Sequence, residues 1–189
     1  MNGRPELMLE AARLWSEREP TPVDALNALS GTQMAVGRFA DALPTLTRYL
    51  AALPADERAK ALLLLPQRFP PQADPKQARQ LVDAVTQPYL TQPEALLARA
   101  QMAMRVGDLA AARQEIREVR RLQPESEPAL LLNAQLIAQQ NPPALIPLFA
   151  DFLSRYPDAA TIRVLYAQQL LAAGRLSEAR AEIEQVLAT

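Results

Sequence analysis

The chain has 189 residues, with 20 basic and 21 acidic side chains, and it contains neither cysteine nor histidine. Disulfides, thiolate metal sites and the Ser–His–Asp or Cys–His arrangements of nucleophilic catalysis are therefore excluded. The near-neutral charge argues against a nucleic-acid-binding protein, because such proteins normally carry a basic excess.

Composition favours an all-α protein. About half of the residues (49%) are apolar, led by alanine and leucine, which suits helices. No run alternates apolar and polar residues as a half-buried strand would. We expect no membrane-spanning helix, because no stretch of about eighteen apolar residues is present. The opening MNGRPELMLE also lacks the apolar centre of a signal peptide.

The apolar periodicity and the turn residues predict eleven helices. We expect them at residues 5–18, 22–35, 38–52, 55–65, 75–87, 93–105, 109–122, 126–140, 143–155, 158–172 and 176–188. The prolines within 66–76 predict a rigid loop and no domain linker, because the helical register resumes on both sides. Pro44 and Pro147 occupy equivalent places in their helices, where each is expected to bend the helix or delay its start.

Four of the five glycines begin a similar pattern. The intervals between Gly3, Gly37, Gly107 and Gly174 are 34, 70 and 67 residues. After each of the last three, alanine follows five positions later, and aliphatic or aromatic residues follow nine and twelve positions later. A proline follows at position seventeen wherever the chain is long enough. A helical pattern that repeats near 34 residues predicts a solenoid of stacked helix pairs.

Each position of this pattern has a physical reason. Glycine adopts the positive φ of a tight turn between two helices without strain. The alanine lets the second helix approach the first closely, and the two later apolar residues share one helix face that points into the stack. Trp15 and Tyr49 stand at the twelfth position and are predicted to pack in the core. The proline ends the unit, because it cannot continue a helix.

The stretches MAVGRFADAL, MRVGDLAAAR and AAGRLSEARAEIEQVL resemble the tetratricopeptide repeat. This resemblance implies an all-α, right-handed solenoid of stacked antiparallel helix pairs. We expect a single solenoid domain over 1–189. It divides into a half unit and five units: 3–22, 23–56, 57–92, 93–126, 127–159 and 160–189. Because the pattern starts and stops within a unit, we expect the chain to be a piece of a longer array.

Two units depart from the repeat pattern. The turn in 57–92 is PQRFPPQADP without a glycine, and the turn in 127–159 is Asn-Pro-Pro. The large aromatic that the family has early in its first helices is also absent. In its place stand leucines and one arginine, namely Leu26, Leu96, Leu130 and Arg163. Arg163 predicts poorer packing of the last first helix.

The resemblance implies that the first helices line an inner groove. Six residues before their glycines stand Gln101 and Gln168, Gln135 occupies the matching place in its unit, and Gly31 does so in the first unit. A glutamine can pair with the amides of an extended peptide. We predict a partner-binding groove of Asn27, Met34, Leu97, Gln101, Met104, Arg105, Leu131, Gln135, Gln139, Val164 and Gln168. The alternative is that glutamine is only a good helix former on a wet surface.

Carboxylates at helical spacing, such as Glu115 with Glu118 and Glu178 with Glu182, are expected to be surface charges beside arginines. We therefore predict no catalytic residue, no metal site and no cofactor. A second charged group, namely Arg113, Arg117, Arg120 and Arg121, is expected to form a solvated outer face. A patch for an acidic partner is the alternative.

The function expected from these observations is a non-catalytic scaffold that binds a protein or peptide, with no nucleic acid partner. ARLWSEREP and RVLYAQQLLAAGRLSEAR also resemble Gram-negative outer-membrane lipoproteins that serve as adaptors of a periplasmic carboxyl-terminal processing protease. That likeness implies the bacterial periplasm or outer membrane. The alternative is a cytoplasmic module of a regulatory or chaperone-like protein, and an enzyme is the third class. Uncapped ends would also allow homo-oligomers.

Overall fold

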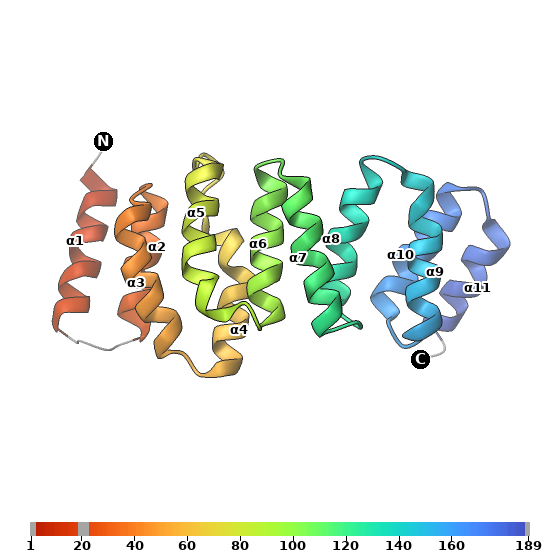
Figure 1. The fold of residues 1–189 in the computed structure, drawn as a ribbon, viewed down its shortest axis with the longest axis horizontal. Coiled ribbons are helices and arrows are strands. Elements are labelled where there is room, and N and C mark those ends of the chain that lie inside the picture. The colour runs from red at the N-terminus through yellow and green to blue at the C-terminus, as the bar shows by residue number, and fades with distance from the viewer. Residues whose placement is uncertain (1–2, 19–22, 188–189) are drawn as a thin grey trace. The chain divides into compact units, whose positions relative to one another are not determined.

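The computed structural model describes residues 3–18 and 23–187. Within these ranges the chain forms eleven α-helices and three 3-10 helices, and no strand (Figure 1). The α-helices are α1 Gly3–Arg18, α2 Val23–Ala35, α3 Phe39–Ala52, α4 Ala55–Leu64, α5 Pro75–Thr86, α6 Pro93–Arg105, α7 Leu109–Leu122, α8 Glu127–Ala138, α9 Leu145–Arg155, α10 Ala160–Ala172 and α11 Leu176–Leu187. The 3-10 helices are η1 Leu65–Arg68, η2 Gln87–Tyr89 and η3 Pro142–Ala144. The all-α prediction is confirmed, and so are the eleven predicted helices.

The chain divides into two compact units, residues 1–118 and 119–189, called here the N-terminal and C-terminal units. In the N-terminal unit α2 packs against both α1 and α3, α4 and α5 each pack against α6, and α3 also packs against α5. In the C-terminal unit α10 packs against α9 and α11, and α8 packs against α9. Successive helices are thus paired along the chain, as in an α-solenoid.

Three of the helix-pair turns are built by glycine. Gly37, Gly107 and Gly174 have φ values of 77°, 78° and 75°, a region that side chains with a Cβ rarely occupy. At the first of these turns the Gly37 N–H donates to the Met34 carbonyl and the Arg38 N–H donates to the Gln33 carbonyl. The other two turns repeat both bonds. This is the Schellman motif, which satisfies the last carbonyls of the preceding helix.

Close contact of the paired helices depends on small side chains. Ala42, Ala112 and Ala179, each five residues after a turn glycine, are at most 1% exposed. At the twelfth position Tyr49 is half-buried and packs on the N-terminal core, whereas Trp15 is 43% exposed. The prediction that Trp15 packs in the core is therefore wrong.

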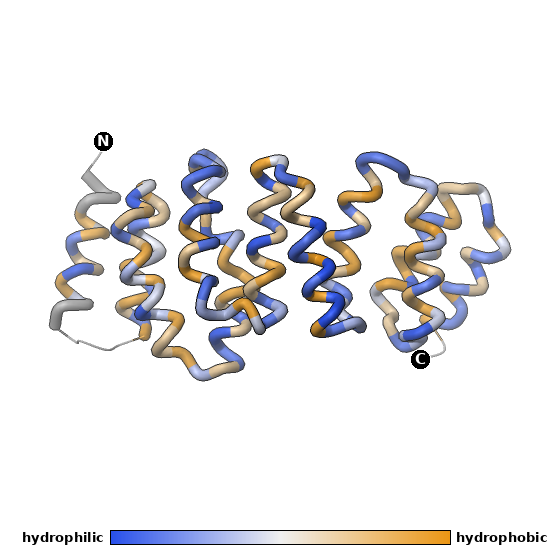
Figure 2. Tube along the Cα trace, in the orientation of Figure 1, coloured by the Kyte–Doolittle hydropathy of each residue, from blue (hydrophilic) through white to orange (hydrophobic). Residues whose placement is uncertain are grey.

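Each unit has a core cluster of its own. In the N-terminal unit buried aliphatic residues of α2 to α6 surround the ring pair Phe39 and Phe69, whose centroids are 5.7 Å apart. In the C-terminal unit Phe149 and Phe152 of α9 are buried with Ile162 of α10. Apolar and polar residues alternate along most of the helices that supply these clusters (Figure 2), as expected for helices buried on one side.

The proline-rich segment 66–76 is more ordered than a loop. Its first residues continue α4 as the 3-10 helix η1, in which Pro66 is buried. At its end Asp74 caps α5, because its carboxylate accepts the backbone N–H groups of Lys76 and Gln77. The prediction of a loop therefore missed a helical turn at one end of the segment and a helix cap at the other.

Two further positions show how the helices accommodate unfavourable residues. Pro147 is the third residue of α9, where a helix does not need its N–H, and the preceding η3 delays the helix start to Leu145. Arg163 of α10 is 12% exposed, and its guanidinium bonds Glu182 Oε2 at 2.5 Å and the Pro157 carbonyl at 2.6 Å. The predicted weakness at Arg163 is thus offset by an ion pair to α11.

No helix within the described residues has the length and apolarity needed to cross a membrane.

Candidate functional site

The predicted groove residues lie on or directly after four first helices. Asn27 and Met34 belong to α2, and Leu97, Gln101, Met104 and Arg105 belong to α6. Both helices are in the N-terminal unit. In the C-terminal unit, Leu131 and Gln135 belong to α8, Gln139 follows that helix, and Val164 and Gln168 belong to α10.

Two of these residues are part of the interior. Met34 is fully buried in the N-terminal core, and Leu97 is 3% exposed. Neither side chain is available to a partner, so the prediction that they face a groove is corrected. Met104, at the place equivalent to Met34, is half-buried, which shows that the repeat register alone does not determine exposure.

The glutamines of the predicted groove are accessible. Gln101 is half-buried on α6, and Gln135 and Gln168 are exposed on α8 and α10. Leu131 and Val164 are half-buried, and Leu131 packs against the C-terminal core. The accessible part of the prediction is therefore mainly amide, with aliphatic surface beside it in the C-terminal unit.

Sequence analysis missed an arginine at this surface. Arg68 of η1 donates through Nη2 to the Asn27 carbonyl at 3.1 Å and to Ser30 Oγ at 3.2 Å. Its guanidinium lies over the Tyr49 ring at 5.6 Å, and burial lowers the pKa of Arg68. A Cβ on Gly31 would lie 3.3 Å from Arg68 Nη2. Arg68 therefore occupies the space that a glutamine side chain would need at position 31.

The predicted groove residue Arg105 also makes a structural contact. Its Nη2 donates to the Pro70 carbonyl at 3.2 Å, and the side chain remains exposed. Arg105 thus fixes the proline-rich segment to the end of α6. In the sequence, the one signal for this contact was the proline-rich turn, because the carbonyl groups of such a turn have no helical partners.

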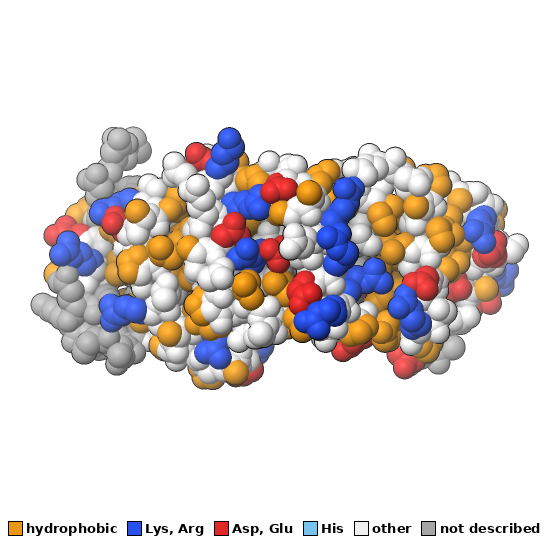
Figure 3. Space-filling view, in the orientation of Figure 1, with side chains coloured by type: hydrophobic (Ala, Val, Ile, Leu, Met, Phe, Trp, Pro, Cys, Tyr) orange, Lys and Arg blue, Asp and Glu red, His pale blue; other side chains and the backbone are white. Residues whose placement is uncertain are grey.

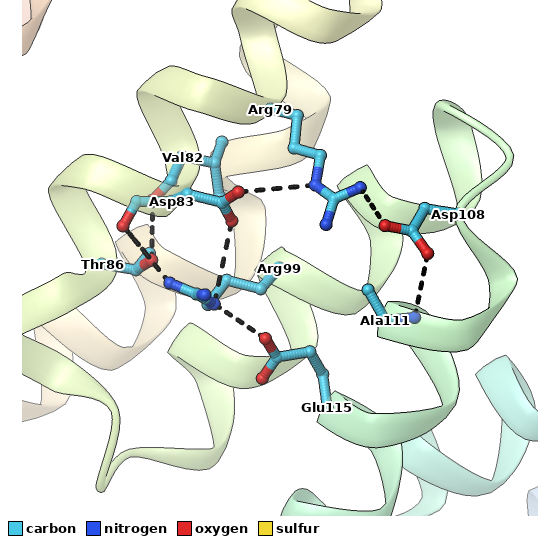
Figure 4. Close-up of polar contacts among 8 residues, drawn as sticks. All are labelled: Arg79, Val82, Asp83, Thr86, Arg99, Asp108, Ala111 and Glu115. Atoms are coloured by element: carbon cyan, nitrogen blue, oxygen red, sulfur yellow. Dashed lines mark hydrogen bonds and ion pairs between the residues drawn. The ribbon is translucent and has the colours of Figure 1, made fainter.

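Carboxylates and arginines form a connected network between α5, α6 and the first half of α7 (Figure 4). Arg79 lies between Asp83 and Asp108, at 3.4 and 2.9 Å. Arg99 lies between Asp83 and Glu115, at 3.7 and 2.9 Å, and also donates to the Asp83 carbonyl. All five residues belong to the N-terminal unit, where they tie three helices together.

The electrostatics of this network favour a structural role. The Ala111 N–H and then the Arg79 guanidinium, both hydrogen-bonded to Asp108, lower the pKa of that carboxyl. The hydrogen bond to Asp108 in turn raises the pKa of Arg79. Both groups therefore stay charged, whereas a general acid needs a raised carboxyl pKa. Asp108 also caps α7 through the Ala111 N–H.

Other carboxylates pair in the same way. Glu115 and Glu182, each eight residues after a turn glycine, accept hydrogen bonds from arginines of the preceding first helices. Glu178 is bonded by Arg175 beside it, and this hydrogen bond lowers the pKa of Glu178. The prediction of neighbouring arginines is confirmed for Glu115, Glu178 and Glu182. Across the described ranges, no three acidic side chains are grouped to hold a metal ion.

Basic side chains gather over α7 (Figure 3). Arg113, Arg117 and Arg121 are exposed, and Arg120 is half-buried. This exposure fits both the predicted solvated face and its alternative, a patch for an acidic partner.

Comparison with known proteins identifies the repeat. Residues 135–189, from α8 to the end of the chain, match the family model of the tetratricopeptide repeat. No curated protein matches the chain. The structure resembles a tetratricopeptide repeat protein from Parabacteroides merdae with a TM-score of 0.56 and 19% identity, covering 98% of this chain and 73% of that one.

Two other solved structures are similar at low identity. TTC0263, a thermophilic TPR protein of Thermus thermophilus, has a TM-score of 0.50 and 17% identity, with 89% of this chain and 92% of that one covered. BtubC (BKLC) from P. vanneervenii has a TM-score of 0.51 and 13% identity, with 98% and 88% covered. The chain is therefore an all-α solenoid with the fold of tetratricopeptide repeat proteins, and residues 135–189 carry the repeat of that family.

Proposed function

We propose that the protein is a non-catalytic scaffold that binds a peptide or protein segment along its first helices. The repeat fold suggests a protein–protein interaction scaffold. The observation that supports the proposal is the accessibility of Gln101 in the N-terminal unit and of Gln135 and Gln168 in the C-terminal unit, each at the same register of its own first helix. Each amide offers a donor and an acceptor to the backbone of an extended segment.

The test removes these amides together. The triple variant Gln101→Ala, Gln135→Ala and Gln168→Ala is compared with wild type in affinity capture from a bacterial lysate, and then in binding to the identified partner. We expect the dissociation constant to rise at least about tenfold, since each lost amide contact is worth about 0.5–1.5 kcal/mol. The Tm should not fall, because alanine is the better helix former.

A control variant on a second helix tests whether the loss of binding is specific to the first-helix glutamines. Gln114→Ala removes an exposed glutamine from α7, a second helix, and should leave partner binding unchanged. A triple variant with wild-type affinity would reject the first-helix surface as the binding site.

We propose the bacterial envelope as the compartment, on the strength of the likeness to outer-membrane lipoprotein adaptors. The alternative is a cytoplasmic regulatory or chaperone-like module. Fractionation of cells that express the full-length protein from its own gene would decide between the two. Recovery in the cytoplasmic fraction would favour the alternative.

We further propose that copies associate through apolar side chains of their terminal helices. Leu7, Leu14 and Trp15 of α1 are 65%, 52% and 43% exposed, and Leu176 and Leu187 of α11 are 65% and 81% exposed. Large apolar side chains grouped on a surface favour an interface. Sedimentation velocity at several concentrations tests this, and a concentration-independent monomer would reject it.

A further inference from the structure

Gln33 of α2 is a polar residue at an apolar place. It stands four residues before Gly37, and the same register holds Ala103 and Leu170, which are 1% and 0% exposed. Gln33 itself is only 9% exposed, and its Oε1 is buried without a hydrogen-bond partner in the structure. An unpaired buried acceptor costs folding free energy, so leucine or alanine would suit folding better here.

A cleft adjoins this amide. A volume of about 710 Å³ lies between α1, α2 and α3, which neighbour one another in the N-terminal unit (Figure 1). Leu9, Leu29, Ala40 and Pro44 give it apolar walls. Its polar and charged lining groups are Glu10, Arg13, Gln33, Arg38, Asp41 and Thr45. Binding sites for organic ligands usually have about 300–1,000 Å³ and a similar mixture of groups.

Three other polar groups of the cleft, on Arg38, Asp41 and Thr45, are already bonded. The Thr45 hydroxyl donates to the Asp41 carbonyl at 3.3 Å, and Arg38 Nε bonds the Asp41 carboxylate at 2.6 Å. Gln33 lines the cleft, and its buried Oε1 makes no hydrogen bond within the described part of the chain. A ligand that fits the cleft therefore needs an N–H donor for this amide.

A second, separate cleft also lies beside α3. It has a volume of about 380 Å³ between α3 and α5, and Gln77 and Gln80 contribute to its lining. Ala40, exposed in the first turn of α3, lines both clefts, so a small side chain stands where they meet. A ligand that occupies both clefts must be long enough to pass over Ala40.

We propose that this surface, called here the Gln33 cleft, binds an extended peptide segment of a partner protein. A backbone amide of the peptide pairs with the Gln33 amide, whose oxygen and nitrogen exchange places by rotation about the last side-chain bond. An apolar side chain fills the space beside Leu9 and Leu29. The peptide then crosses Ala40 toward the glutamines of α5. Gln33 belongs to α2, a first helix, whereas α1, α3 and α5 are second helices. The site is distinct from the surface proposed above, because Gln101, Gln135 and Gln168 line neither cleft.

The experiment uses a phage-displayed library of random dodecapeptides, selected on the whole chain. The library is first depleted on the variant Ala40→Trp, which blocks the junction of the two clefts at an exposed position that does not support the core. Synthetic peptides recovered from wild type are then measured by fluorescence anisotropy. Failure to enrich any peptide over the depleted pool would overturn the proposal.

The decisive variant is Gln33→Leu. It should weaken the peptide about tenfold or more, because the pairing group is lost. It should also raise the Tm, because leucine is buried at the equivalent position 170. A binding defect from misfolding would instead lower the Tm. If the variant lowers the Tm, Ala40→Lys, at the exposed junction, replaces it in the binding measurement. A peptide that binds these variants as tightly as wild type would refute the assigned site.

The triple variant of Gln101, Gln135 and Gln168 serves as the control. It should bind the selected peptides like wild type, since these residues are on first helices outside both clefts. Loss of peptide binding in the control would assign the peptides to the first-helix surface and contradict the Gln33 cleft. The two proposed surfaces can thus fail independently.

Discussion

Gly107 and Gly31 have different backbone conformations, so the same substitution should affect them differently. Gly107 has φ 78° in the turn between α6 and α7, and a Cβ there would meet nothing within 4 Å. Gly107→Ala should therefore cost about 1–2 kcal/mol of unfolding free energy through backbone strain alone. Urea unfolding followed by circular dichroism measures this cost.

Gly31→Ala is the matched substitution within a helix. Alanine gains about 1 kcal/mol of helix propensity over glycine. Against this, its Cβ would press on the flexible end of Arg68 at 3.3 Å and disturb the bonds to Asn27 and Ser30. We expect the two effects nearly to cancel, within about 0.5 kcal/mol. Equal destabilisation by both substitutions would contradict the argument from backbone strain at Gly107.

Burial of single residues could be predicted only in part. The register correctly placed Ala42, Ala112 and Ala179 at close helix contacts, because position five is defined within one helix pair. It did not distinguish Met34 from Met104, because neighbouring helices decide how deeply each is covered. Arg68 was missed for the same reason: its partners are about forty residues away in sequence.

The ion pairs between helices should contribute more than those along one helix. Arg99 and Glu115 join α6 to α7, and their side chains are 19% and 20% exposed. A double-mutant cycle with Arg99→Met and Glu115→Gln should give a coupling energy of about 1 kcal/mol. The control cycle uses Arg180 and Glu184, a pair within α11 that is 82% and 60% exposed.

We expect the control cycle to give less than about 0.5 kcal/mol, since solvent screens exposed pairs. Chemical unfolding of the wild type, single variants and double variants supplies both cycles. Equal coupling energies would mean that the network of Figure 4 adds nothing beyond surface pairing.

The cap of α7 should make stability depend on pH in the acid range. The hydrogen bond from Ala111 and the Arg79 guanidinium place the folded-state pKa of Asp108 below the unfolded value, which is about 3.9. Its stabilising contribution is therefore complete above the unfolded pKa and is lost as the pH falls through the lowered folded pKa. Asp108→Asn keeps a capping side chain without the charge.

Between pH 7 and pH 3 the unfolding free energy of wild type should fall more than that of Asp108→Asn. The unfolding free energy of Glu178→Gln should also fall less than that of wild type, because the hydrogen bond from Arg175 lowers the pKa of Glu178. Urea unfolding at both pH values measures the difference. Identical pH dependence in wild type and both variants would show that these carboxylates have the same pKa folded and unfolded.

The helices themselves were predictable to within two residues, because periodicity, turn glycines and prolines act locally. The segment after α4 was predicted less accurately. Its prolines indicated a loop, but Pro66 is tolerated in η1, since a short 3-10 turn requires few N–H donors. The candidate surfaces were predictable only as a register of amides, since a cleft depends on the distances between helices that the sequence does not specify.

Separate cores should make the two compact units respond separately to damage. Repeat proteins derive their stability from contacts between neighbouring helices, so a lost contact acts mainly nearby. Phe149 is buried in the C-terminal core, and Leu46 is buried in the N-terminal core. Phe149→Ala should cost about 3–5 kcal/mol and Leu46→Ala about 2–5 kcal/mol, from lost burial and the cavity left behind.

Hydrogen exchange measured by mass spectrometry shows where this cost falls. Phe149→Ala should accelerate exchange most in α8, α9 and α10, and Leu46→Ala should do so most in α2, α3 and α5, because amides exchange through local opening of the weakened unit. Each variant is thereby the control for the other. Uniform acceleration along the whole chain by either substitution would mean that the units unfold as one, and the stability of each would then depend on contacts beyond its own core.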